Sequence, residues 1–203
     1  LVSTVNAVIG DQELDTGFHV TTPDAPDVQR YLALMRDAGL THAVLETTSH
    51  GLAQYRVDAC NFQVAAVTNI THEHLNFHGT YEAYRAAKAR LFEMLPPDGV
   101  AILNQDDCSY EYLATTSAPR SVVRYGFDPN ADLRPENIAY TSSGLSFTAI
   151  RKGFMIPVES PLVGDFNISN ILAALGVTVF ALGVEPAAAQ HGIAAMKGVP
   201  GRM

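Results

Sequence analysis

Three short apolar runs constrain the fold of this chain more than any other feature of its sequence. They cover residues 42–46 (HAVLE), 64–69 (VAAVTN) and 100–104 (VAILN), and they are rich in valine and isoleucine. Continuous runs of this kind are typical of strands that are buried on both faces, as in a parallel sheet. Helical patterns lie between and after them, so the alternation predicts a doubly wound α/β fold.

Capping and stop signals divide the remaining chain into helices and one different region. Thr80 is placed to cap a helix that Pro96 and Pro97 end, and Gly39 ends an earlier one. The predicted helices cover residues 27–38, 80–95, 107–115, 167–182 and 185–196. Residues 121–158 consist of short alternating pieces between Gly, Pro and Asn. The sequence therefore predicts a mostly parallel sheet flanked by helices, with a small antiparallel sub-sheet over about residues 121–160.

Composition narrows the class of protein. The chain has 203 residues, of which 47% are hydrophobic, enough for one domain with a sizeable core. The net charge of −8 argues against non-specific binding to nucleic acid or to an anionic membrane, but not against binding of a nucleotide. The sequence has two cysteines, Cys60 and Cys108, and it has no apolar run of membrane-spanning length and no secretory signal. These features indicate a cytoplasmic protein.

Each apolar run leads into a cluster of polar side chains. The clusters are Glu46–Thr47–Thr48–Ser49–His50, Asn69 with His72–Glu73–His74, and Asn104–Gln105–Asp106–Asp107. Ligands of open α/β sheets bind beyond the carboxyl ends of the strands, so the three clusters together predict a site. The alternative is that these residues only begin loops and cap helices. Glu46 and His74 suit magnesium or manganese, whereas the spacing of the histidines is weak evidence for zinc.

Three further positions carry possible chemistry. Lys88 lies on or beside the apolar stripe of its predicted helix, where a charge is costly unless it is paired, modified or extended to solvent. Asn167 and Asn170 open a long helix, either as a cap or as amides that read the edge of a base. Arg202 offers a planar cation for phosphate, or is a basic residue at a chain end.

Taken in order, several stretches resemble one enzyme family. They are TTPD (21–24), ETTSHGLAQYRV (46–57), TNITHEHLNFHGTYEAYRAAKARLF (68–92), LNQDD (103–107), GDFNISNILAAL (164–175) and VPGRM (199–203). The chain resembles the central, ATP-binding domain of the Mur ligases, most closely the UDP-N-acetylmuramoyl-tripeptide synthetases. The combination spans nearly the whole chain and is far more specific than any one motif.

The resemblance implies ATP-dependent formation of a peptide bond. A substrate carboxylate would attack the γ-phosphate of ATP, and an amine would displace phosphate from the resulting acyl-phosphate, with Mg²⁺ spreading the negative charge. The partners would be UDP-N-acetylmuramoyl dipeptide, an amino acid and ATP, in peptidoglycan synthesis by a bacterial, cytoplasmic monomer. The third amino acid would be meso-diaminopimelate or lysine.

The resemblance also implies roles for single residues. Lys88 matches a lysine that the family carboxylates to a carbamate, and it would be catalytic together with His74. The metal ligands would be Glu46, His74 and Lys88. Contacts to the muramyl dipeptide would come from Thr21, Thr22, Ser49, Gln54 and Arg56, and contacts to ATP from Asn69, Asn167, Asn170 and Arg202.

Departures from the family pattern leave alternatives open. Asn76 stands where the family's R-D-H-L-D loop ends in Asp, which leaves room for a paralogue. We expect residues 1–203 to be the central domain without its phosphate-binding loop, which would precede Leu1, and without the amino-acid-binding domain, and to be inactive alone. The alternatives are a ligase of the cyanophycin-synthetase or folylpolyglutamate-synthase type and a non-catalytic nucleotide-sugar binding module.

Overall fold

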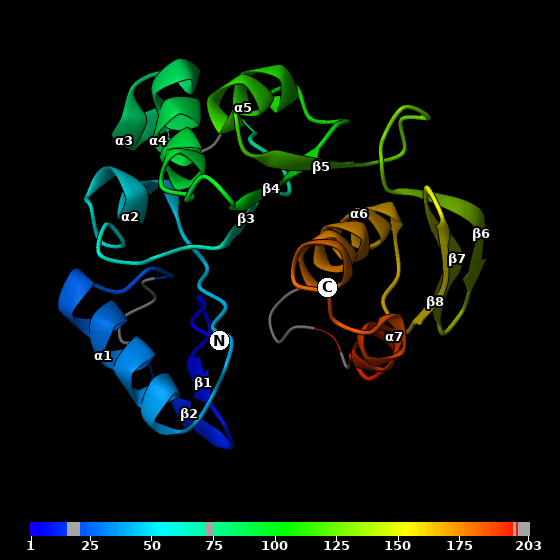
Figure 1. Ribbon diagram of the computed structural model, residues 1–203, viewed down its shortest axis with the longest axis horizontal. Coiled ribbons are helices and arrows are strands. Elements are labelled where there is room, and N and C mark those ends of the chain that lie inside the picture. Colours follow the sequence, from blue (N-terminus) through cyan, green and yellow to red (C-terminus); the bar gives the residue numbers. More distant parts are fainter. Residues whose placement is uncertain (16–20, 72–74, 197, 199–203) are drawn as a thin grey trace. The chain divides into compact units, whose positions relative to one another are not determined.

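The computed structural model describes residues 1–15, 21–71, 75–196 and 198 (Figure 1). The chain divides into two compact units. The first unit comprises Leu1–Asn61 and His72–Met94, and the second comprises Phe62–Thr71 and Leu95–Met203. Each unit is described by itself below.

The first unit begins with a small antiparallel hairpin of β1 (Ala7–Ile9) and β2 (Gln12–Leu14). Val2 pairs on one side with Ala7 and on the other, in parallel, with Leu45. The predicted strand at residues 42–46 is therefore reduced to a bridge at Leu45, and Val44 is 63% exposed. After Val2 the chain turns, since the Ser3 N–H donates to the Asn6 carbonyl (3.1 Å).

The described part of the first unit contains four helices. They are α1 (Ala25–Asp37), α2 (Ser49–Ala53), α3 (Leu75–His78) and α4 (Tyr81–Glu93). Thr80 caps α4 as predicted, since its side chain accepts from Ala83 N–H. In α1, Val28, Tyr31 and Met35 recur at helical spacing and are buried. Tyr31 and Met35 belong to a core cluster with Val2, Ala7 and Ile9.

The second unit contains a three-stranded parallel sheet in the order β3 (Val64–Ala66), β4 (Val100–Asn104) and β5 (Ser121–Tyr125). Residues 100–104 form a strand as predicted, whereas the strand predicted at 64–69 ends at Ala66. The antiparallel region begins later than predicted, because residues 121–125 pair in parallel with β4. The Tyr125 hydroxyl, buried at the end of β5, donates to the Val67 carbonyl (2.8 Å).

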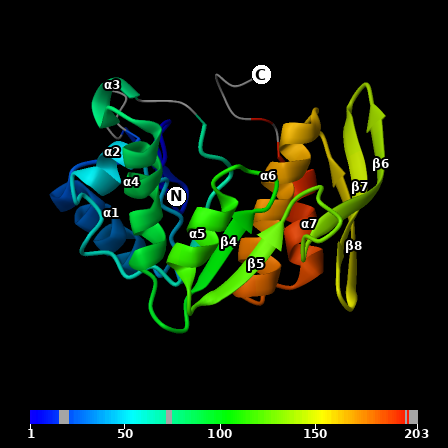
Figure 2. The same ribbon diagram turned by 90° about the horizontal axis from the view of Figure 1, so that it is seen from above.

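An antiparallel sheet follows, in the order β6 (Arg134–Thr141), β7 (Gly144–Arg151) and β8 (Phe154–Ser160). The helices of this unit are α5 (Tyr110–Ser117), α6 (Asp165–Leu175) and α7 (Pro186–Ala194), with a π-helical segment, η1, over Gly176–Ala181. Within this unit, α6 and α7 lie between the parallel strands and the antiparallel sheet in both ribbon views (Figures 1 and 2). One core joins these layers through Ile102, Tyr125, Phe147, Ile168 and Leu172.

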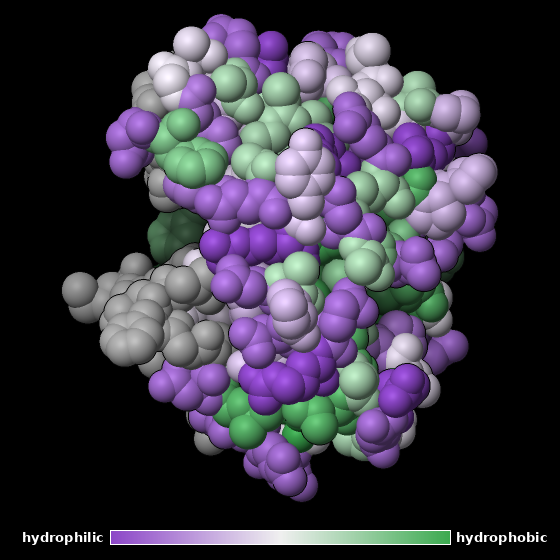
Figure 3. Space-filling model, turned by 90° about the vertical axis from the view of Figure 1, so that its left-hand side faces the viewer, coloured by the Kyte–Doolittle hydropathy of each residue, from purple (hydrophilic) through white to green (hydrophobic). Residues whose placement is uncertain are grey.

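The face in Figure 3 is mainly hydrophilic, with scattered apolar areas. No helix among the described residues is long and apolar enough to span a membrane.

Candidate active site

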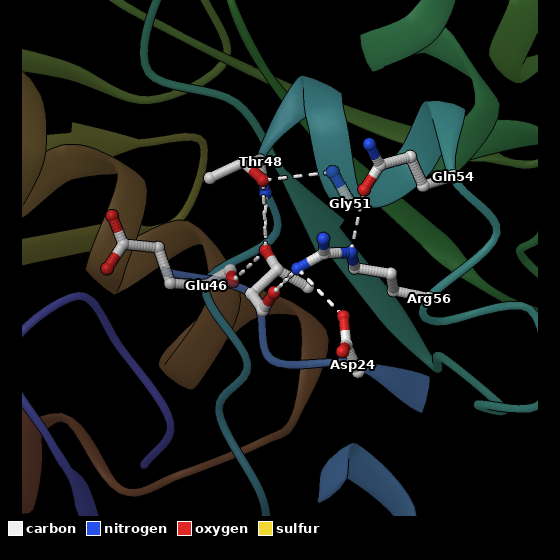
Figure 4. A network of polar contacts seen from close by, with 7 residues as sticks. Asp24, Glu46, Thr48, Gly51, Gln54 and Arg56 are labelled. Atoms are coloured by element: carbon white, nitrogen blue, oxygen red, sulfur yellow. Dashed lines mark hydrogen bonds and ion pairs between the residues drawn. The ribbon is translucent and has the colours of Figure 1, made fainter. Parts of the chain in front are cut away.

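A network of hydrogen bonds in the first unit connects most of the predicted substrate contacts. The Thr22 hydroxyl donates to the Glu46 carbonyl (3.1 Å) and accepts from the Thr48 N–H (2.8 Å). Thr48 in turn caps α2 by accepting from Gly51 N–H (3.0 Å; Figure 4). Thr22 is only 1% exposed, so its hydroxyl holds the start of α2 against the segment that carries Glu46.

Arg56 is the cation of this network, and its guanidinium makes several contacts. Its Nε donates to Gln54 Oε1 (2.9 Å), and its Nη1 donates to the Thr22 carbonyl (2.8 Å) and lies 3.3 Å from Asp24 Oδ1 (Figure 4). These contacts, which involve Nε and Nη1, fix the guanidinium in place. The second terminal nitrogen, Nη2, is left to donate to a ligand. Such a planar, oriented cation suits a carboxylate or phosphate.

Glu46 lies in the chain before α2, and its carboxylate points away from Gln54 and Arg56 (Figure 4). Its Oε2 accepts from the backbone N–H of Thr4 (3.1 Å) and from the Thr4 hydroxyl (3.2 Å). The Thr4 and Thr21 hydroxyls are 2.8 Å apart. Hydrogen bonds thus link Thr21 to Glu46 through Thr4, and they link Arg56 to Gln54 and Thr22. Thr4 and Asp24 were not predicted as site residues, although Asp24 lies within TTPD, and Thr48 was predicted only as a member of the first polar cluster.

Ser49 and Lys88 belong to a second cluster of the first unit. Ser49 is 1% exposed, and its hydroxyl is 2.9 Å from Nε2 of His78 in α3. The His78 ring lies 5.4 Å from the Tyr84 ring, and Lys88 Nζ lies 5.6 Å from the centroid of that same ring. Lys88 is half-buried, beside the buried Tyr84 and Phe92 of α4, where the sequence placed it. His78 was not predicted, although it lies within the motif that contains His74.

Only part of the predicted magnesium site lies among the described residues. Mg²⁺ prefers one or two carboxylates and completes its shell with water and phosphate oxygens, so it does not need a cage of protein ligands. Glu46 supplies one such carboxylate, and carboxylation of Lys88 would supply a second. The described residues contain no group of three or more His, Cys, Asp or Glu side chains that could hold a metal. His74, the third predicted ligand, lies outside those residues.

The predicted ATP contacts that can be described all lie in the second unit. Asn69 is exposed after β3. Asn167 Nδ2 donates to the Val163 carbonyl (2.8 Å), and Asn170 Nδ2 lies 3.4 Å from Asn167 Oδ1. Asn167 is not the cap of its helix, because the helix begins earlier and Gly164 occupies that position. Arg202 lies outside the described residues.

A tyrosine and a carboxylate lie next to these asparagines. Tyr140 of β6 donates a hydrogen bond to Asp165 in the first turn of α6. This hydrogen bond to an anion raises the pKa of Tyr140 above its ordinary value. The Phe166 side chain is 60% exposed on the same turn.

The third polar cluster is structural. Asn104 Nδ2 donates to the Thr68 carbonyl (2.7 Å), and Asp107 accepts from the N–H groups of Ile70 (3.1 Å) and Ser109 (2.9 Å). Asp106 accepts from two N–H groups after β5, those of Phe127 (2.6 Å) and Asp128 (3.0 Å). These side chains fasten loops at the ends of the strands, as the alternative interpretation of the cluster held.

Comparison with known proteins places these two sets of residues in context. Residues 1–178 match the model of the Mur ligase middle domain. UDP-N-acetylmuramoyl-L-alanyl-D-glutamate–2,6-diaminopimelate ligase of Gloeobacter violaceus is 43% identical over 183 residues, 90% of this chain and 37% of the relative. The ligase of the same name from Solibacter usitatus is 40% identical over 98% of this chain and 41% of the relative. The chain therefore spans well under half the length of these relatives.

Solved structures agree. A structure of a UDP-N-acetylmuramoyl-L-alanyl-D-glutamate–2,6-diaminopimelate ligase superimposes with a TM-score of 0.87 at 33% identity, over 99% of this chain and 41% of that one. A folylpolyglutamate synthase (FPGS) from L. casei shares the fold at a TM-score of 0.55 and 21% identity, over 69% of this chain and 35% of that one.

Proposed function

The chain belongs to the Mur ligase family, and on that premise we propose that it is the middle domain of an ATP-dependent ligase for UDP-N-acetylmuramoyl-L-alanyl-D-glutamate. The amino acid added would be 2,6-diaminopimelate, as in the names of its relatives at about 40% identity. Lysine is the other candidate for the amino acid that is added.

The observation that carries this proposal is the anchored guanidinium of Arg56. UDP-N-acetylmuramoyl dipeptide has both phosphates and carboxylates, and Arg56 Nη2 is oriented to donate to one of them. We assign this substrate to Thr21, Thr22, Ser49, Gln54 and Arg56. Thr22 and Ser49 are each 1% exposed, so their part is to hold the contact residues in position.

We assign ATP to Asn69, Asn167, Asn170 and Arg202. An amide offers a donor and an acceptor together, which is what the edge of adenine requires. Mg²⁺ would be held by Glu46, His74 and a carboxylated Lys88. When bound, the ion would neutralise part of the phosphate charge during transfer.

The reaction follows from these assignments. The γ-carboxylate or α-carboxylate of the D-glutamyl residue attacks the γ-phosphate of ATP, and ADP leaves. The amine of the incoming amino acid then attacks the acyl-phosphate carbon, loses a proton and expels inorganic phosphate. Arg56, Gln54 and Thr21 would hold the muramyl substrate during both steps, and a carboxylated Lys88 would carry a negative charge in place of the positive charge of the lysine.

Two alternatives are less well supported. A folylpolyglutamate-synthase-type ligase shares the fold, but at 21% identity that likeness extends to the fold alone. A non-catalytic module would have no use for the combination of Glu46 and Lys88. A monomeric, cytoplasmic protein is the simplest setting for this function, and neither Cys60 nor Cys108 forms a disulfide, as in a reducing compartment.

The test is release of phosphate by the ligase that carries this chain. We expect release to require ATP, UDP-N-acetylmuramoyl-L-alanyl-D-glutamate and diaminopimelate together, with lysine as the comparison amino acid. Lys88→Ala should lower kcat roughly 100-fold, the scale for losing one group that stabilises transition-state charge. Lys152→Ala, an exposed lysine of the second unit, is the matched control and should retain activity. Full activity of Lys88→Ala would remove the carbamate from the mechanism.

A further inference from the structure

The helix α2 ends in an unusual way, at a tyrosine with positive φ. Tyr55 has φ +60° and follows the last residues of α2. Its N–H donates to the Leu52 carbonyl (3.3 Å), and the Arg56 N–H donates to the Gly51 carbonyl (2.9 Å). This pair of bonds is the Schellman ending of a helix, whose left-handed position is usually glycine because a side chain there strains the backbone.

The Tyr55 ring makes a contact with Arg90 that a glycine at this position could not make. The guanidinium carbon of Arg90 lies 4.1 Å from the centroid of the Tyr55 ring, a cation–π contact. Arg90 Nη2 is also 3.3 Å from both carboxylate oxygens of Asp58. Arg90 therefore contacts residues on both sides of Arg56 in the chain, Tyr55 before it and Asp58 after it. Its own side chain is 27% exposed, so this contact is partly shielded from solvent.

The contacts of Arg90 with Tyr55 and Asp58 connect two parts of the proposed site. Tyr55 lies between Gln54 and Arg56, whose side chains bond to each other. Arg90 belongs to α4, the helix of Lys88, and lies two residues after it. We propose that Arg90 is a positioning residue, which acts through Tyr55 and Asp58 to hold the turn of Gln54 and Arg56 in a fixed place relative to the Lys88 helix. The inference rests on the proposed function, because its purpose is to orient the muramyl substrate.

The test separates positioning from stability. In the ligase that carries this chain, Arg90→Gln and Tyr55→Gly should each raise KM for UDP-N-acetylmuramoyl-L-alanyl-D-glutamate about fivefold, the scale of one cation–π contact. The KM for ATP and kcat should stay within about twofold. Tyr55→Gly removes the ring but suits the positive φ, so its melting temperature should not fall. Tyr55→Phe keeps the ring and should retain the original KM.

A matched control exists in α1. Arg30 lies 4.8 Å from the Tyr31 ring and 3.1 Å from Asp27, so Arg30→Gln removes the same kinds of contact away from the turn and should leave every KM unchanged. An unchanged substrate KM in both Arg90→Gln and Tyr55→Gly would overturn the inference, and so would a rise that occurs only where the melting temperature falls. If the unmodified ligase releases no phosphate, the proposed function fails and the inference fails with it. Turnover with unchanged KM values in the variants defeats the inference alone.

Discussion

At the scale of single residues, the buried Thr22 hydroxyl joins the segment that carries Glu46 to the start of α2. The Thr22 hydroxyl is already hydrogen-bonded to Glu46 and Thr48, and so it is not available to a ligand. The linear sequence does not show these hydrogen bonds. Burial of Thr22 depends on Gly51, where an added Cβ would lie 2.7 Å from the Thr22 side chain. That contact joins residues far apart in the chain, so only the folded structure reveals it.

The ion pair of Arg124 and Asp132 gives a prediction at this scale. Burial alone would raise the pKa of Asp132, but the hydrogen bonds and charge of Arg124, at 2.7 Å, outweigh it and lower that pKa below its ordinary value. The stabilisation is therefore present at neutral pH and is lost as the pH falls through the folded-state pKa. We expect Asp132→Asn to lower the free energy of unfolding by about 1 kcal/mol at pH 7, a modest value because solvent screens the pair.

Urea denaturation at a series of pH values checks this prediction. The difference between Asp132→Asn and the unmodified chain should shrink at acid pH, where the unmodified carboxyl is also protonated. The control is Glu136→Gln, which removes the carboxylate partner of Arg134. Because Glu136 is more exposed than Asp132, this substitution should lower the free energy of unfolding by less. A difference that is independent of pH would contradict the assignment of the shift to Arg124.

At the scale of elements, periodicity located the helices but not their internal geometry. The helix predicted over residues 167–182 is α-helical only as far as Leu175, and η1 continues it with π-type bonds, such as Leu182 N–H to the Val177 carbonyl (3.1 Å). The Thr178 hydroxyl also donates to the Ala174 carbonyl (2.7 Å), so a side chain shares one of the backbone acceptors. Likewise, residues 121–125 resemble a hairpin strand locally, but pairing with β4 decides their direction.

Gly176, where α6 meets η1, supplies the prediction at this scale. A Cβ at this position would lie 2.8 Å from Ile102 Cγ2, in the buried centre of β4. We expect Gly176→Ala to destabilise the chain by roughly 1–3 kcal/mol, because overpacking exceeds the gain in helix propensity. Adding Ile102→Leu, which moves the branch away from Cβ, should recover part of that loss.

Thermal and urea unfolding of the single and double variants measure this coupling. Gly192→Ala in α7 is the matched control, since a Cβ there meets nothing within 4 Å, and it should be neutral or stabilising. Equal effects of Gly176→Ala and Gly192→Ala would show that packing against Ile102 does not require glycine.

At the scale of the whole molecule, the sequence predicted one converging site, and the structure distributes its residues over two units. Thr21, Thr22, Glu46, Ser49, Gln54, Arg56 and Lys88 all lie in the first unit, whereas Asn69, Asn167 and Asn170 lie in the second. Sequence order alone could not predict this division, because the first unit takes up residues 72–94 after the chain has already begun the second. The residues that we assign to the muramyl substrate therefore lie in one unit, and the described residues that we assign to ATP lie in the other.

The last prediction follows from that division. In the ligase that carries this chain, Arg56→Lys keeps the charge but loses the oriented fork, so KM for UDP-N-acetylmuramoyl-L-alanyl-D-glutamate should rise about tenfold while KM for ATP stays within about twofold. Asn170→Ala, an exposed side chain of the second unit, should do the reverse, raising KM for ATP about fivefold. Initial rates at saturating levels of the other substrates give both constants. A variant of one unit that raises both KM values together, with an unchanged melting temperature, would mean that the two substrates are not divided between the units in this way.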